Sequence, residues 1–116
     1  MQEAPVKVLL VGVDIGQEAD FEHSMEELAS LAEAAEKEVV GQIVQRLDHV
    51  NKALYIGTGK VDEVRRLAEE RGAQEVVFDN SLTPSQVRNL GKELELTVID
   101  RTILILDIFA RRAQAR

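Results

Sequence analysis

Residues 6–16 read VKVLLVGVDIG, and this stretch decides the fold class. Val6 to Val13 form a near-continuous apolar run that ends at Asp14 and Gly16. A run of this kind is typical of a strand that is buried on both faces of a parallel sheet. We therefore expect helices on both sides of this strand.

Helical and strand patterns alternate along the rest of the chain. Apolar residues recur at helical spacing over roughly residues 21–37, 61–72 and 83–94, and a further helix is expected from Thr102 to at least Arg112. Short runs rich in β-branched residues predict strands at 39–47, 75–79 and 96–100. The alternation indicates a three-layer α/β domain with a mainly parallel sheet of about four strands, in the expected order 2-1-3-4.

Several short signals predict where these elements begin, bend and end. A capping box pairs a hydroxyl with a Glu or Gln three residues later, and together they satisfy the first N–H groups of a helix. The sequence offers two such pairs, Ser24 with Glu27 and Thr83 with Gln86, with Pro84 in the first turn of the second. Glycine suits a helix end or a bulge, which we predict at Gly72 and Gly41 respectively.

Charge is distributed unevenly along the chain. The net charge is −7, and residues 1–38 carry 2 basic and 10 acidic side chains, which leaves +1 for the remainder. An acidic total argues against strong non-specific nucleic-acid binding, although it leaves room for a local RNA contact. From Arg101 onward the chain contains four arginines and one aspartate. These arginines would either be solvent-exposed residues of a helix without a binding role, which we favour, or contact phosphates.

The sequence predicts a chain without a membrane span, which is compatible with the cytoplasm. Its longest apolar runs, 8–13 and 103–106, fall far short of the roughly 20 residues that a membrane helix needs. No basic region precedes the first apolar run, so we expect no signal peptide. The chain has no cysteine, which is compatible with a reducing compartment.

The segment YIGTGK at residues 55–60 is the sharpest local motif. A glycine turn before a helix exposes N–H groups at the positive end of the helix dipole, where an anion binds well. The candidate anion or RNA-phosphate residues are Gly57, Thr58, Gly59 and Lys60, together with Arg101. The alternative is a plain glycine turn. The motif has neither P-loop spacing nor the GxGxxG spacing of dinucleotide-binding folds.

Three aspartates end predicted strands, at the edge where open α/β sheets bind ligands. Asp14, Asp79 and Asp100 would either gather around Mg²⁺ or a phosphoryl group, or cap the following turn or helix, which we favour. Arg101 would pair with one of them or reach a phosphate.

We expect no catalytic residue and no resident metal. His23 and His49 have no second His or Cys at ligand spacing, and the serines lack the context of an exposed nucleophile. The few aromatic residues are too scattered to form a base-stacking platform.

The last segment, ILILDIFA at residues 103–110, is apolar around most of a helical circumference. Such a helix needs cover on more than one side, although a strand at 103–108 stays open as an alternative. The candidate interdomain or partner surface comprises Ile105, Ile108, Phe109, Arg111 and Arg112.

Three segments together, YIGTGK at 55–60, FDNSLTPSQVRNL at 78–90 and VIDRTILILDIFARRA at 98–113, resemble the N-terminal domain of HflX-family GTPases. Their order and spacing are specific, and the resemblance covers nearly the whole chain. The positions that match the family pattern are Gly57, Gly59, Lys60, Pro84, Gln86, Asn89, Asp100 and Arg101.

The resemblance implies a targeting and regulatory module. In that family this domain precedes a helical linker and a Ras-like GTPase domain, and the protein binds the large ribosomal subunit in rescue or splitting of ribosomes. Residues 1–100 would then form the N-terminal α/β domain and 101–116 the start of the helical segment. GTP and Mg²⁺ would belong to the GTPase domain, and this chain would hold no cofactor.

The implied partners are rRNA of the large subunit and the protein's own linker and GTPase domain. Two alternatives remain: a phosphate- or nucleotide-binding domain that uses the turn at 57–60, and a module that self-associates through its final helix.

Overall fold

A four-stranded parallel sheet forms the middle layer of the domain in the computed structural model, which describes residues 4–16 and 19–114. Its strands are β1 (Val6–Asp14), β2 (Lys37–Arg46), β3 (Glu75–Phe78) and β4 (Thr97–Asp100). The strand order is β2-β1-β3-β4, which confirms the predicted 2-1-3-4 arrangement.

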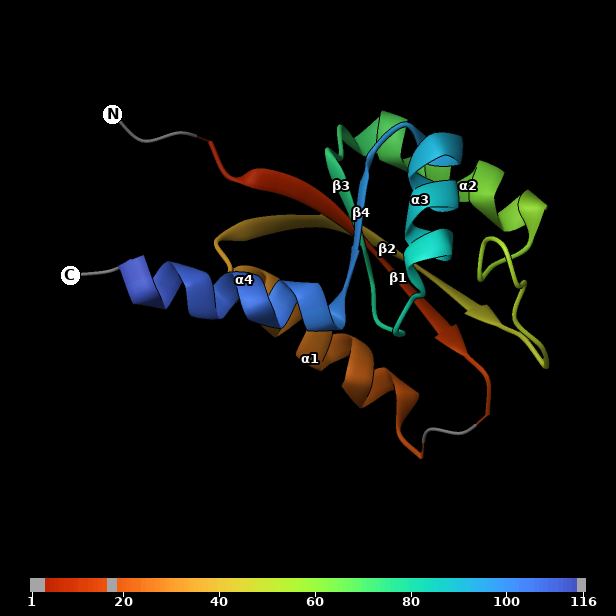
Figure 1. Cartoon of the computed structure of the whole chain (residues 1–116), viewed down its shortest axis with the longest axis horizontal. Coiled ribbons are helices and arrows are strands. Elements are labelled where there is room, and N and C mark those ends of the chain that lie inside the picture. Colours follow the sequence, from red (N-terminus) through yellow and green to blue (C-terminus); the bar gives the residue numbers. More distant parts are fainter. Residues whose placement is uncertain (1–3, 17–18, 115–116) are drawn as a thin grey trace.

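Four helices complete a three-layer α/β fold, as predicted. They are α1 (Phe21–Ala34), α2 (Thr58–Arg71), α3 (Pro84–Leu94) and α4 (Arg101–Gln114). Helices α1 and α4 cover one face of the sheet, and α2 and α3 cover the other (Figure 1). No helix within residues 4–16 and 19–114 is long and apolar enough to cross a membrane.

Strand β1 connects the two halves of the core. It pairs with β2 on one side and β3 on the other, and all its residues from Val8 to Val13 are buried. Leu9, Val11 and Val13 face α2 and α3, whereas Val8 and Leu10 face α1 and α4. Alternate side chains of one strand thus enter opposite cores, as the period of a strand requires.

A bulge interrupts the pairing of β1 with β2. Val8 pairs with Val39 but Leu9 pairs with Gly41, so Val40 is the extra residue. Its carbonyl accepts a hydrogen bond of 2.6 Å from Nη1 of Arg71. A Cβ at Gly41 would lie 3.1 Å from Cδ1 of Leu9. These contacts confirm the predicted bulge.

Two of the predicted helix ends are confirmed and one is wrong. Gly72 ends α2 in the left-handed conformation with φ 69°, and Thr83 forms a complete capping box with Gln86. However, α1 begins three residues before Ser24, and its N-cap is Asp20, whose side chain accepts from the N–H of His23. Residues 103–108 are helical, which excludes the strand alternative.

Gly12 sets how closely α1 approaches the sheet. A Cβ at this position would lie 2.8 Å from Cζ of Phe21 and would overlap the thioether of Met25. We predict that Gly12→Val lowers the free energy of unfolding by about 1–3 kcal/mol, because overpacking forces α1 outward. Urea unfolding followed by circular dichroism measures this change.

Gly59→Ala is the control, since nothing lies within 4 Å of a Cβ there. It should leave stability unchanged or raise it slightly, because alanine is the better helix former. Equal stability of the Gly12→Val protein and the wild type would contradict the close packing of α1.

Candidate functional site

The three strand-end aspartates lie at one edge of the sheet but have separate roles. Oδ1 of Asp14 accepts from the N–H of Gly16 at 2.9 Å. Asp100 accepts from the N–H of Leu82 at 2.9 Å and from the N–H of Ile103 at 3.1 Å. Asp14 thus stabilises a turn, and Asp100 caps α4. The capping interpretation therefore holds for both residues.

Asp79 has a different role, because it forms a buried ion pair with Arg101. Its side chain is 4% exposed, and its Oδ1 lies 3.0 Å from Nε of Arg101 and 2.5 Å from Nη2. The hydroxyl of Ser24 donates to Oδ2 of Asp79 at 2.7 Å. Both oxygens of this carboxylate are therefore satisfied.

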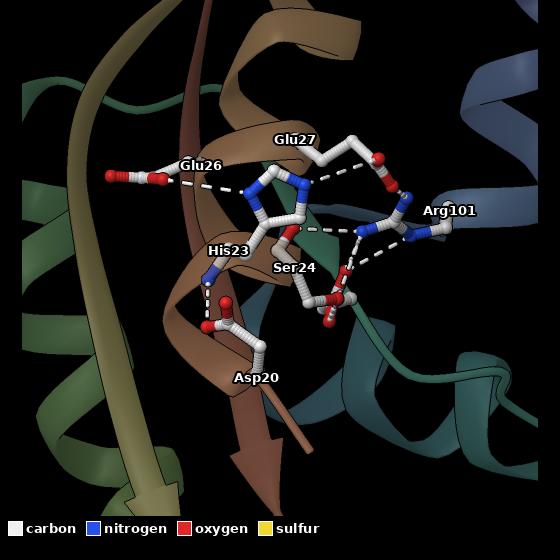
Figure 2. Close-up of polar contacts among 7 residues, drawn as sticks. Asp20, His23, Ser24, Glu26, Glu27 and Arg101 are labelled. Carbon is white, nitrogen blue, oxygen red and sulfur yellow. Dashed lines mark hydrogen bonds and ion pairs between the residues drawn. The ribbon is translucent and has the colours of Figure 1, made fainter. Parts of the chain in front are cut away.

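The guanidinium of Arg101 also contacts α1 (Figure 2). Nη1 lies 2.8 Å from Oε1 of Glu27, and Nη2 donates to the carbonyl of Ser24 at 2.8 Å. Burial lowers the pKa of Arg101, but its bonds to Asp79 and Glu27 outweigh this, so the pKa is raised overall. Of the two alternatives for Arg101, the structure shows pairing with a carboxylate.

Ser24 and Glu27 form no capping box, since both lie inside α1 and face Arg101. No group of three or more His, Cys, Asp or Glu side chains among residues 4–16 and 19–114 could hold a metal ion.

The glycine turn lies at the start of α2, on the opposite face of the sheet from Arg101. Gly57 is the N-cap, with φ −72°, and no side chain caps the helix. No atom lies within 4 Å of a Cβ built on Gly57 or Gly59, so neither glycine is required by backbone strain or packing. Lys60 lies next to this turn and pairs with Glu63 at 2.9 Å. The structure thus keeps the five candidate anion residues in two separate places.

A tight loop over residues 51–56 positions the glycine turn. Asn51 and Tyr55 form an antiparallel bridge, and Tyr55 adopts the left-handed conformation with φ 66°. Oδ1 of Asn51 accepts from the N–H groups of Ala53 and Leu54, both at 2.8 Å. Ile56 is fully buried, so the chain enters α2 from a fixed point.

Side chains of α3 hold this loop through hydrogen bonds to its carbonyl groups. Nε2 of Gln86 donates to the carbonyls of Asn51 at 3.4 Å and Lys52 at 3.2 Å, and Nδ2 of Asn89 donates to the carbonyl of Ala53 at 3.1 Å. Gln86 is 6% exposed, and its Oε1 also completes the capping box of α3. Two positions of the FDNSLTPSQVRNL segment therefore hold the loop that leads into the YIGTGK segment.

Asn80 completes the network at the sheet edge and was not predicted from the sequence. Its side chain accepts from the N–H of Val13 and donates to the carbonyl of Val13, both at 2.9 Å. Burial raises the pKa of Tyr55, while the side chain of Asn80 acts in the opposite direction. An Asn directly after a strand-end Asp was the available signal.

The exposed apolar surface of α4 differs from the predicted one. Ile108 is 8% exposed and lies in the core with Leu104, so it cannot form a partner surface. Ile103, Leu106 and Phe109 are instead 46%, 58% and 60% exposed. These three residues, spaced three apart, form what we call the α4 stripe.

The other predicted surface residues of α4 differ in exposure. Ile105 is half-buried, and Arg111 and Arg112 are exposed. Arg111 pairs with Glu36 at 2.9 Å and approaches Asp107 at 3.4 Å.

Arg101→Ala should lower the free energy of unfolding by about 3–5 kcal/mol, because it leaves the buried carboxylate of Asp79 without its cation. Chemical denaturation measures this loss. Arg66→Ala is the matched control: its side chain is 80% exposed in a surface pair with Asp62, and the loss should be about 0–1 kcal/mol. Equal losses for both variants would show that the buried pair has no special role.

Gln86→Ala should lower stability by about 1–3 kcal/mol, because the loop carbonyls lose their donor and α3 loses its capping box. Hydrogen exchange at the N–H groups of Asn51 and Tyr55 should accelerate in the same variant. Arg88→Ala, on the exposed side of α3, should change neither quantity. Unchanged exchange in Gln86→Ala would mean that the loop is held by other contacts.

Known proteins resemble this chain in sequence. The family model described as GTP-binding GTPase N-terminal matches residues 22–110. A protein named GTPase HflX from Alkalihalophilus pseudofirmus is 49% identical over 110 residues, which cover 94% of this chain and 26% of that protein. GTPase HflX from Escherichia coli is 38% identical over 112 residues, which cover 97% of this chain and 26% of that protein.

Solved structures show the same fold. SsGBP in complex with GDP superposes with a TM-score of 0.71 at 24% identity, covering 96% of this chain and 31% of that chain. A GTP-binding protein from Sulfolobus solfataricus, also with GDP, gives a TM-score of 0.67 at 25% identity, covering 90% and 30%. The chain thus spans about a quarter of the length of the curated relatives and about a third of these structures.

The match over residues 22–110 covers well over half of the sequence, and the relatives named GTPase HflX extend it to nearly the whole chain. The chain therefore belongs to the GTP-binding GTPase N-terminal family, and it is an N-terminal domain of the HflX type.

Proposed function

We propose that this chain is the docking and regulatory domain of an HflX-type GTPase that binds the large ribosomal subunit and acts in ribosome rescue or splitting. The observation that carries the proposal is the match to the N-terminal family model over residues 22–110, in a chain that covers about a quarter of its relatives. The sequence contains no P-loop, so its role in such a protein would be other than GTP hydrolysis.

The start of α2 is the best candidate for a contact with rRNA phosphate. The uncapped N–H groups after Gly57 lie at the positive end of the helix, and no side chain crowds either glycine. Lys60 would exchange its partner Glu63 for a phosphate. Arg101 would support α4 instead, because its guanidinium is occupied by Asp79 and Glu27.

The α4 stripe would contact the linker or GTPase domain of the longer protein. Leu106 and Phe109 are large apolar residues with more than half of their surface exposed, which is typical of a buried interface in an intact assembly. GTP and Mg²⁺ would bind in the GTPase domain. The protein would act in the cytoplasm, where ribosomes are found.

Co-sedimentation with large ribosomal subunits across a salt series tests the docking proposal. We expect the 116-residue chain to bind, with an affinity that falls as salt rises. Lys60→Ala should weaken binding and reduce the salt slope by about 1, because one phosphate contact is lost. Lys92→Ala, an exposed lysine near the end of α3, is the control and should have no effect.

Absence of binding by this chain, with binding by the longer protein, would assign recognition to the linker or GTPase domain. A second candidate function is nucleotide binding at the same glycine turn, favoured by the open space around Gly57 and Gly59. Calorimetry with Mg²⁺ and ATP or GTP separates the two: saturable heat that is lost in Lys60→Ala would support nucleotide binding.

A further inference from the structure

A cleft of about 780 Å³ lies between α1 and the second half of β2. Its apolar lining comes from Phe21, Met25 and Ala29 on α1 and from Val44 on β2. Val44 is 44% exposed, although its neighbour Ile43 on the opposite face is 6% exposed. The helix layer therefore leaves this part of β2 uncovered.

Four carboxylates also line the cleft: Asp14, Asp20, Glu22 and Glu26. Within residues 4–16 and 19–114, none of them pairs with a lysine or arginine. Glu26 approaches only His23, at 3.9 Å, and points away from Glu27 and Arg101 (Figure 2). Arg46 of β2 lies opposite Asp14 in the sheet, so the rim charge that remains without a nearby lysine or arginine among the described residues is that of Glu22 and Glu26.

The cleft is bordered by an open sheet edge. Within the described chain β2 pairs with β1 alone, so its outer N–H and C=O groups have no strand partner along Lys37–Arg46. An open edge with an apolar surface beside it is a common place for a peptide to bind, because the main chain supplies hydrogen bonds and alternate side chains fill the groove.

We propose that this cleft binds a basic, amphipathic polypeptide segment of a partner protein. Apolar side chains of the segment would contact Phe21 and Val44, and its lysines or arginines would pair with Glu22 and Glu26. A nucleic acid would be repelled by the same carboxylates. A metal ion does not fit, because the described residues include no cluster of three ligands. The inference does not depend on the proposed ribosome docking.

An NMR titration of the 116-residue chain tests the proposal. The synthetic peptide has leucine and lysine in turn at every second position, with serine between them, so that both residue types lie on one face of an extended strand. Amide signals of Ala29, Gln42 and Val44 should shift in a saturable manner, because these residues line the cleft. A peptide of the same pattern with glutamate in place of lysine should cause no shift at these positions. Shifts confined to the α4 stripe would overturn the proposal.

Charge reversal at the rim is the decisive variant. Glu22→Lys with Glu26→Lys should weaken binding of the leucine-lysine peptide roughly tenfold at physiological salt, because two attractions become repulsions. Glu33→Lys with Glu69→Lys is the matched control: both positions are exposed, the net charge changes equally, and affinity should change less than about twofold.

Val44→Lys is a second variant at an exposed position, and it should weaken binding without loss of fold. Equal weakening by the rim variant and its control would mean attraction by net charge alone and would overturn the proposal. Sedimentation velocity tests whether a second copy of this chain occupies the cleft. Self-association that is lost in the rim variant would identify a second copy of this chain in the cleft and would likewise overturn a separate partner.

Discussion

The burial of β1 on both faces is the constraint on which the rest of the structure depends. Every residue from Val8 to Val13 is hidden, so each face of the sheet needs its own helix layer. Chain order then decides which helices supply each layer. Right-handed crossovers place α1 on one side and α2 and α3 on the other, and α4 returns beside α1. The two layers consequently present different chemistry.

The layer of α1 and α4 is joined by charge as well as by apolar packing. Arg101 connects the end of β3 to two residues of α1, at the point where α4 begins. In the opposite layer, Gln86 and Asn89 donate neutral hydrogen bonds to the loop over 51–56. Arg65 of α2 also donates to the carbonyl of Glu93 on α3 at 2.9 Å. The first network sets the direction of α4 and its exposed stripe. The second sets the entry of the chain into α2.

Much of the fold follows from local patterns, but the site depends on contacts that no local pattern encodes. The apolar run at 6–13, the capping box at Thr83 and the cap at Gly72 are short-range features and were predicted correctly. The pairing of Arg101 with Asp79, rather than with the adjacent Asp100, depends on side-chain direction at a shared sheet edge. Asp20 precedes Ser24 and is an equally good cap residue, so spacing could not choose between them.

The sequence also could not predict which residues of α4 are exposed, and Ile108 is the example. A helix that is apolar on all sides does not indicate which side packs on the sheet. The observed division leaves Ile103, Leu106 and Phe109 outside. The remaining surfaces differ in charge. The cleft at the β2 edge of the sheet is lined by four acidic residues, whereas α4 ends in Arg111 and Arg112. A phosphate-bearing partner would approach the start of α2 or the end of α4 and avoid the edge formed by β2. A basic polypeptide would follow the opposite preference, so the two kinds of partner would not compete for one surface.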